Sequence, residues 1–171
     1  MQEFYEKEGI SVPIKHTVKA VDGYILYPSA RNIIENIVNV YKKRFMHIIP
    51  AQIMPLLDVG GGLDRDCKIV GVKKPFNVMM PRYRYLLLIS ENIFAGMVPA
   101  NQYIVICREL LRIHSCFDGR VLKPPVEDFV AILRNFGFYY AGKKENVPNI
   151  LAPDFDNELF EKQMMEEAQW D

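Results

Sequence analysis

The spacing of apolar residues predicts three helices. The first covers residues 29–45, with Ser29 as its expected N-cap. The second covers residues 100–114 and is apolar around much of its circumference, which is typical of a helix at the centre of a domain. The third begins at Pro125, which suits a first helical turn, and ends at Gly137. The expected core positions of the three helices are Ile33, Ile34, Ile37, Val38 and Tyr41, then Leu110 and Leu111, then Val126, Phe129, Val130, Leu133 and Phe136.

Three further segments, residues 67–72, 76–80 and 83–90, are predicted strands. Residues 86–89 are wholly apolar, which indicates a strand buried on both faces. Residues 17–21 and 24–27 are short β-prone pieces, and residues 48–57 fit a short helix that Pro50 and Pro55 restrict. Together these elements predict an α+β fold, in which a small, mainly antiparallel sheet packs beside the central helix and other helices surround it. We expect one domain over residues 1–153, followed by an acidic helix or tail over residues 154–171.

Composition narrows the functional classes only slightly. Half of the 171 residues are apolar, and 21 basic side chains balance 21 acidic ones. This neutrality favours neither a nucleic acid nor an anionic membrane as partner, although acidic residues gather at both ends and leave the middle mildly basic. The N-terminal residues show no secretory signal, and no apolar run could span a bilayer. The three cysteines lack metal-ligand spacing, so we expect free thiols, a cytoplasmic protein and no membrane partner.

The most informative stretch is Arg108-Glu109-Leu110-Leu111-Arg112 in the central helix. Its frame is that of the zinc-peptidase motif His-Glu-x-x-His, in which two histidines four residues apart bind zinc and the glutamate acts as general base. Here both ligand positions are arginine, and a guanidinium keeps its proton and has no lone pair for a metal. The helix therefore has the frame of a zinc site without its ligands.

A longer run of the chain supports this interpretation. The strand end Ile-Ser-Glu-Asn (residues 89–92), the helix Cys-Arg-Glu-Leu-Leu-Arg-Ile (107–113) and the segment Phe-Asp-Gly-Arg-Val-Leu-Lys-Pro-Pro-Val-Glu-Asp-Phe (117–129) occur in that order. This order resembles a family of zinc metallopeptidases found in archaea and phages. The resemblance spans residues 29–140 in its order of elements, with the specific motifs confined to residues 83–137. It implies a zincin-like scaffold.

The same resemblance implies which residues replace the site. The first metal ligand of the family falls on Arg108, the general base on Glu109 and the second ligand on Arg112, while the later histidine falls on Pro124 or Pro125. All three expected imidazoles are thus absent. We expect no bound metal and no other cofactor, and Glu109 to be a vestigial general base.

The two arginines must still be neutralised. Because Arg108 and Arg112 lie four apart on a largely apolar helix, they share a face and repel each other unless a negative charge lies near. One solution is internal, through ion pairs with carboxylates near in sequence. The other is an external anion. We favour the internal solution, for which the candidate carboxylates are Glu91, Glu109, Glu127 and Asp128.

The sequence therefore favours a catalytically inactive metallopeptidase-like protein, a pseudoenzyme that serves as a binding or regulatory module with a protein partner. Its expected setting is the cytoplasm of a cell or the interior of a virus-infected one. One alternative is an active metal-dependent hydrolase or peptidase with ligands of another kind. A third reading, suggested by the basic middle of the chain, is a subunit of a larger nucleoprotein assembly.

Overall fold

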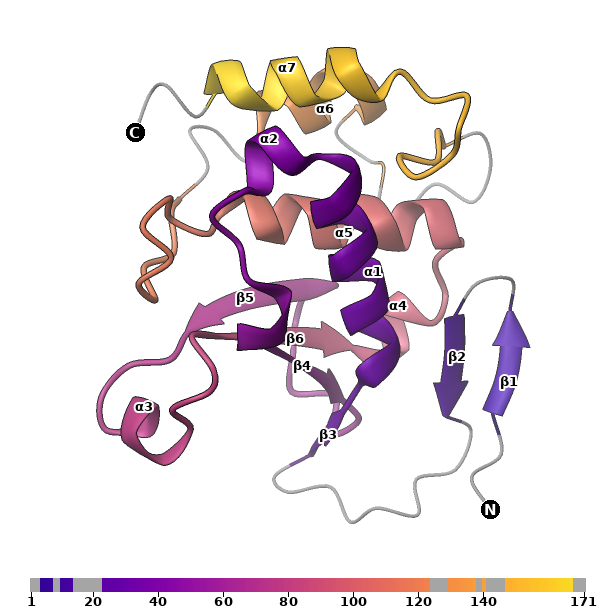
Figure 1. Cartoon of the computed structure of the whole chain (residues 1–171). Helices are drawn as coiled ribbons and strands as arrows, with labels where there is room; N and C mark the ends of the chain where they lie inside the picture. The colour runs from indigo at the N-terminus through magenta and orange to yellow at the C-terminus, as the bar shows by residue number, and fades with distance from the viewer. Residues whose placement is uncertain are drawn as a thin grey trace.

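The computed structural model describes residues 4–7, 10–13, 23–123, 129–137, 140 and 147–167 (Figure 1). Its strands are β1 (Phe4–Lys7), β2 (Ile10–Pro13), β3 (Tyr24–Leu26), β4 (Ile53–Asp58), β5 (Cys67–Gly71) and β6 (Tyr85–Ser90). Its helices are α1 (Pro28–Val40), α2 (Lys42–Phe45), the 3-10 turn η1 (Pro50–Gln52), α3 (Phe76–Met79), α4 (Glu91–Phe94), α5 (Pro99–Leu111), α6 (Val130–Phe136) and α7 (Asn157–Glu167). None of the described helices is long and apolar enough to cross a bilayer.

The main sheet has the strand order β3-β4-β6-β5, while β1 and β2 form a separate antiparallel pair. The two outer pairings of the main sheet are antiparallel, and the central pairing of β4 with β6 is parallel. The α+β class is therefore confirmed, with a mixed sheet of four strands.

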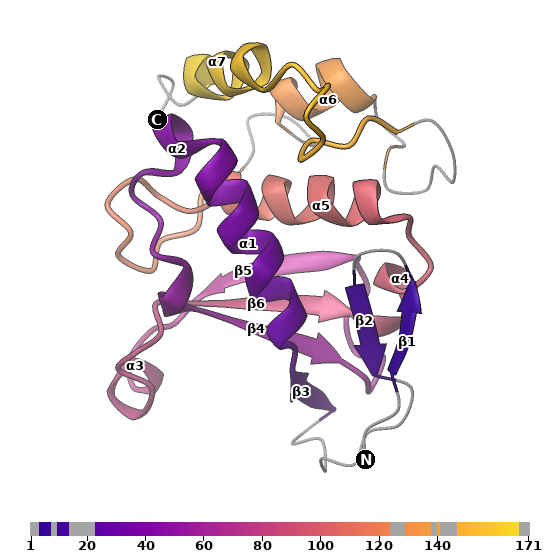
Figure 2. The ribbon, with the colours of Figure 1, turned by 45° about the vertical axis from the view of Figure 1, so that its right-hand side comes forward.

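The helices cover one face of this sheet. The buried side chains of the two central strands alternate with partly exposed ones, so that Ile53, Leu57 and Leu87 are at most 1% exposed. Figure 2 shows α1 and α5 lying across this face, with α6 and α7 beyond α5. Helix α5 thus has the sheet on one side and helices on the other. This arrangement confirms the prediction of a central, buried helix.

Strand β4 corrects the prediction of a helix over residues 48–57. Only η1 is helical there, and Ile53 to Asp58 pair with β6 over their whole length. The carbonyl of Pro55 accepts a hydrogen bond from the backbone N–H of Tyr27 at 3.1 Å, on the side away from β6. Since the N and C=O of one strand residue point to the same side, the missing N–H of this proline costs no bond to β6.

The other helices differ from prediction mainly at their ends. Helix α1 starts at Pro28 after Tyr27, so Ser29 is not its N-cap. The predicted helix is interrupted at Tyr41, and α2 follows as a separate short helix. Helix α6 ends at Gly137 as predicted, with φ of 76° at that glycine. Its expected first turn at Pro125 lies outside the described residues. Phe129 and Phe136 are buried as predicted, whereas Leu133 is only partly buried and Ala131 and Ile132 face the core as well.

Residues 76–80 also differ, because they form the short helix α3 rather than a strand. Strands β5 and β6 are confirmed close to their predicted bounds. Helix α7 packs on α2 and α6 through the buried side chains of Phe160 and Met164. Tyr41 helps to hold this end of the chain, since its hydroxyl donates to the carbonyl of Ile150 at 2.5 Å and also lies 2.7 Å from Oδ1 of Asn157.

The packing of α5 gives a direct test of this architecture. Leu111 is 1% exposed. We expect Leu111→Ala to lower the free energy of unfolding by about 2–5 kcal/mol, because it deletes methyl groups from a packed core. Chemical denaturation measures this loss. The matched control is Leu159→Ala on α7, where the side chain is 50% exposed, and there the stability should hardly change. Equal stability of the two variants would contradict the placement of α5.

Candidate functional site

Glu109 is a carboxylate held inside the core. Helix α5 points it at the edge strand β5, and its side chain is 1% exposed. Its Oε2 accepts hydrogen bonds from the backbone N–H of Ile69 at 2.8 Å and from Nη1 of Arg112 at 2.9 Å. Its Oε1 accepts from Nε of Arg108 at 3.2 Å. Glu109 therefore joins the central helix to the edge of the sheet, and both of its oxygens are occupied.

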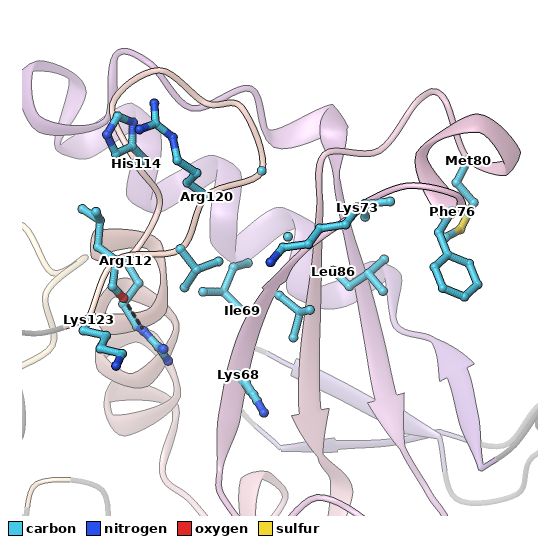
Figure 3. A pocket seen from close by; sticks show the side chains of 16 residues that line it. Lys68, Ile69, Lys73, Phe76, Met80, Leu86, Arg112, His114, Arg120 and Lys123 are labelled. Carbon is cyan, nitrogen blue, oxygen red and sulfur yellow. Dashed lines mark hydrogen bonds between the residues drawn. The ribbon is translucent and has the colours of Figure 1, made fainter.

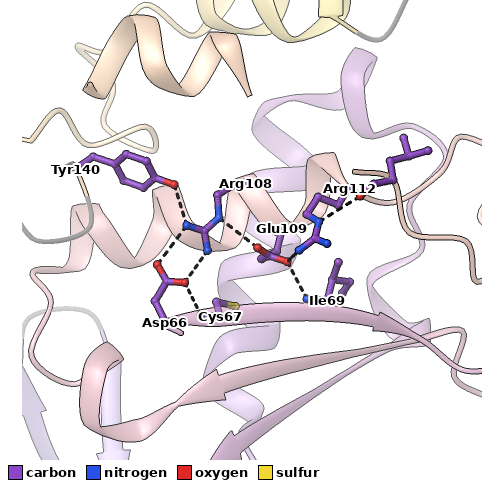
Figure 4. A network of polar contacts seen from close by, with 8 residues as sticks. Asp66, Cys67, Ile69, Arg108, Glu109, Arg112 and Tyr140 are labelled. Atoms are coloured by element: carbon purple, nitrogen blue, oxygen red, sulfur yellow. Dashed lines mark hydrogen bonds and ion pairs between the residues drawn. The ribbon is translucent and has the colours of Figure 1, made fainter. Parts of the chain in front are cut away.

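Arg108 carries the largest set of polar contacts in the site (Figure 4). Its two terminal nitrogens bind both oxygens of Asp66 at 2.6 and 3.2 Å, which is the planar paired geometry that a guanidinium prefers. It also donates to the hydroxyl of Tyr140 at 3.0 Å. Asp66 stands just before β5 and accepts the backbone N–H of Cys67 at 2.6 Å. Arg108 thus ties the start of β5 to α5.

Arg112 closes the other end of the site. Besides its bond to Glu109, its Nε donates to the carbonyl of Leu122 at 3.3 Å. The backbone N–H of Leu122 returns a bond to the carbonyl of Arg112 at 2.7 Å, next to a bridge between Ile113 and Val121. The chain after α5 is therefore folded back against the end of the helix. We call Asp66, Arg108, Glu109, Arg112 and Tyr140 the arginine network.

The arginine network balances its own charge. Two guanidinium groups face two carboxylates, and the side chains of Arg108, Asp66 and Arg112 are only 13%, 11% and 17% exposed. Burial disfavours the charge on Arg108, but Tyr140, Asp66 and Glu109 outweigh this and raise the pKa of its guanidinium above the ordinary value. The guanidinium of Arg108 is therefore held in its charged form by its partners.

The two buried thiols beside the network are unreactive in this setting. Burial raises the pKa of Cys107 to about 12. It also raises the pKa of Cys67 well above the usual range, and the negative charge of Glu109 adds to that effect. Both sulfurs are thus thiols rather than thiolates at neutral pH.

The structure brings together three of the residues singled out from the sequence, Arg108, Glu109 and Arg112. Within the described part of the chain, Asp66 and Glu109 rather than Glu91 bind the two guanidinium groups. Glu91 begins helix α4, directly after β6. The remaining candidates, Glu127 and Asp128 with the replaced ligand positions Pro124 and Pro125, lie outside the described residues. The role of Glu109 as a vestigial general base stays a prediction.

Sequence reasoning missed Asp66, which lies 42 residues before Arg108. It also missed that three side chains of types that can ligate a metal, His114, Cys116 and Asp118, have their ligand atoms within 4.8 Å of one another. In that loop the Nδ1 of His114 accepts the backbone N–H of Cys116 at 3.1 Å, and Asp118 is paired with Arg120 at 2.7 Å. Both of these side chains thus already have a hydrogen-bond partner within the loop.

A groove of about 1150 Å³ adjoins the network along β5 (Figure 3). We call it the β5 groove. One side is the loop that follows α5, and the other side carries Phe76 and Met80 from the α3 region. The basic side chains that line it are Lys68, Lys73, Arg112, Arg120 and Lys123, together with His114, and the lining residues include no carboxylate. Its apolar lining is formed by Ile69, Val70, Val72, Leu86, Val121 and Leu122.

A close backbone contact sets one end of the β5 groove. A side chain on Gly71 would overlap the carbonyl oxygen of Gly119, so only glycine allows β5 and this loop to approach so closely. Gly119 itself has φ of 91°, in the region that glycine favours. These two glycines place the cationic loop beside the edge strand.

Comparison of the chain with protein-family models, with curated protein sequences and with solved structures finds no match. The resemblance to archaeal and phage metallopeptidases therefore rests on the motifs in the sequence.

The arginine network should contribute strongly to stability. We expect Arg108→Ala to lower the free energy of unfolding by roughly 3–5 kcal/mol, because it leaves Asp66 and Glu109 short of a partner in a largely buried setting. A double-mutant cycle with Asp66→Asn, measured by denaturant unfolding, isolates the coupling between the two side chains. Arg120→Ala is the matched control, since its pair with Asp118 is exposed, and it should leave stability unchanged. No loss of stability in Arg108→Ala would show that the network is not structural.

Proposed function

We propose that the protein is a non-catalytic binding module built on a metallopeptidase-like scaffold. The observation that carries the proposal is the sequestration of Glu109. Both of its oxygens are bound by arginine or by backbone N–H, and the side chain is 1% exposed. A general base must come within hydrogen-bond reach of the proton that it removes. With three hydrogen bonds already on its two oxygens and almost no exposed surface, Glu109 is out of reach of a substrate.

The two arginines support the same proposal, because they occupy positions where metal ligands would be needed. A metallopeptidase needs about three protein ligands with lone pairs around its zinc. Arg108 and Arg112 stand at two of the positions where the resemblance places ligands, and both are held in ion pairs. Their positive charge compensates the carboxylates, as a metal ion would. In this proposal the residues at the former zinc site now stabilise the core, and the protein acts by binding a partner rather than by catalysis.

The β5 groove is the proposed binding site. Its lining combines apolar side chains with three lysines, Lys68, Lys73 and Lys123, and with Arg112 and Arg120, which are paired with Glu109 and Asp118. Such a surface suits an extended, acidic segment of a protein partner that also carries apolar side chains. The apolar side chains would cover Val70, Val72 and Leu86, and the acidic ones would meet Lys68 and Lys123. We propose a regulatory role of this kind, in a cell or in a virus-infected one.

The absence of catalysis is tested by metal and activity measurements. We expect no stoichiometric zinc in protein purified without chelator, because the ligand positions are arginines. We also expect no hydrolysis of labelled casein after addition of zinc, manganese or cobalt. Elemental analysis and fluorescence measure the two quantities. About one zinc per chain, lost together with activity, would contradict the proposal. If His114→Ala then removed the zinc, the loop with Cys116 and Asp118 would be the metal site of a hydrolase.

Binding is tested with an acidic peptide that contains leucine, measured by fluorescence anisotropy. We expect Lys68→Glu/Lys123→Glu to weaken binding by roughly tenfold or more, because it reverses two charges on the groove rim. The control Lys42→Glu/Lys162→Glu makes the same change in net charge on exposed residues away from the groove, and should bind normally.

The same experiment addresses a nucleic-acid partner, which the basic rim also favours. A single-stranded oligonucleotide serves as competitor over a range of salt concentrations. If it bound more tightly than the peptide, with affinity falling steeply as salt rises, the groove would belong to a nucleoprotein assembly instead. Equal peptide binding by the groove variant and its control would contradict the groove as the site.

A further inference from the structure

Residues 72–84 form an arm that stands away from the body of the protein, with α3 at its tip (Figures 1 and 2). The backbone N–H of Val72 donates to the carbonyl of Arg84 at 2.8 Å and closes the base of the arm. Nearer the tip, the N–H of Met80 donates to the carbonyl of Phe76 at 2.9 Å. The arm therefore has a shape set by its own hydrogen bonds. We call it the α3 arm.

The tip of the α3 arm is apolar and exposed. Phe76 is 59% exposed, and Val78 and Met79 are each 75% exposed. Single apolar residues on a surface need no explanation, but three within four consecutive positions on a projecting tip form a patch. Leaving them in water is unfavourable, so the patch is expected to bury itself against something else.

The base of this patch is ringed by positive charge. Lys73 and Lys74 precede the tip, Arg82 and Arg84 follow it, and all four are exposed. Among the described residues, none of these four cations makes an ion pair. The chain has no acidic residue at all between Asp66 and Glu91. The neutral total charge of the protein thus hides a segment that is wholly cationic.

In contrast to the expectation of no membrane partner from the total charge of the chain, we propose that the α3 arm attaches the protein to an anionic lipid surface. Phe76, Val78 and Met79 would enter the boundary between headgroups and acyl chains, and the cations would lie on the phosphates. Stable attachment without a membrane-spanning helix takes two signals, such as apolar insertion together with a basic cluster, and the arm supplies both. A convex tip also suits a deformable surface better than a rigid protein, which would need a matching pocket.

This inference goes beyond the proposed function and can fail independently of it. Val78, Met79, Lys74 and Arg82 do not line the β5 groove, so they can be replaced without altering it. Phe76 and Lys73 belong to both the arm and the groove, so the variants that test the arm leave these two residues unchanged.

Vesicle sedimentation of the full chain tests the proposal. We expect binding to vesicles of phosphatidylcholine with about one third phosphatidylserine, and none to phosphatidylcholine alone. Val78→Ser/Met79→Ser should weaken partitioning roughly tenfold, because it removes the inserted apolar surface. Lys74→Gln/Arg82→Gln should weaken it by a similar factor, and high salt should abolish what remains. All four positions are exposed, so the variants should fold normally.

The control is Leu159→Ser/Lys162→Gln on the acidic helix α7, which removes one exposed apolar side chain and one exposed cation elsewhere. It should bind the mixed vesicles like the parent. The proposal is overturned if the parent ignores anionic vesicles, or if the control loses as much binding as the arm variants. It is also overturned if the arm variants bind vesicles normally but lose the acidic peptide, since the arm would then belong to a protein interface.

Discussion

The packing of the central helix depends on how one buried carboxylate is satisfied. Glu109 is enclosed between α5 and β5, where an unpaired charge would be strongly unfavourable. The N–H of Ile69 supplies one bond, and the guanidinium groups of Arg108 and Arg112 supply the others. These bonds fix the height and rotation of the helix over the edge strand, because both arginines are themselves held, Arg108 by Asp66 and Arg112 by Leu122.

The neutrality of this network explains how a largely apolar helix tolerates two arginines on one face. Each guanidinium meets carboxylate oxygens at hydrogen-bond distance, so the repulsion between them is offset locally. A zinc ion would neutralise a nearby carboxylate too, but it would leave a coordination position open to water. An arginine has no coordination position, so it cannot hold an activated water next to Glu109. The sequence change from imidazole to guanidinium, as the resemblance implies it, would thus remove chemistry and keep electrostatic balance.

Much of the fold was accessible from the sequence because local patterns determine it. Helices α1 and α5 and strands β5 and β6 follow directly from apolar spacing. Strand β4 does not, because residues 48–57 fit a short helix by their local pattern, and only the pairing with β6 shows that Ile53–Asp58 are extended and that the missing N–H of Pro55 faces away from β6. Residues 76–80 have the local pattern of a strand, but the described structure places no partner strand beside them, and they form α3 instead.

The candidate site was predictable only in part. The arginines and Glu109 were marked by their spacing within a single helix. Asp66 was not, since nothing local distinguishes it from Asp64 in the same loop, and only the tertiary fold brings it to Arg108. The α3 arm was hidden in a different way. Total charge averages over the chain, whereas binding to a surface depends on which charges are neighbours in space.

Arg112 connects the interior network with the β5 groove. Its Nε and Nη1 are engaged inside, by Leu122 and Glu109, yet the side chain also lines the groove. Within the described part of the chain its Nη2 donates to no protein group. An acidic ligand that reached this nitrogen would add a bond to a guanidinium already held in position, at little cost in side-chain entropy. The same guanidinium would then share its positive charge between the ligand and Glu109. Binding in the groove and the stability of the core are therefore expected to be linked through this one residue.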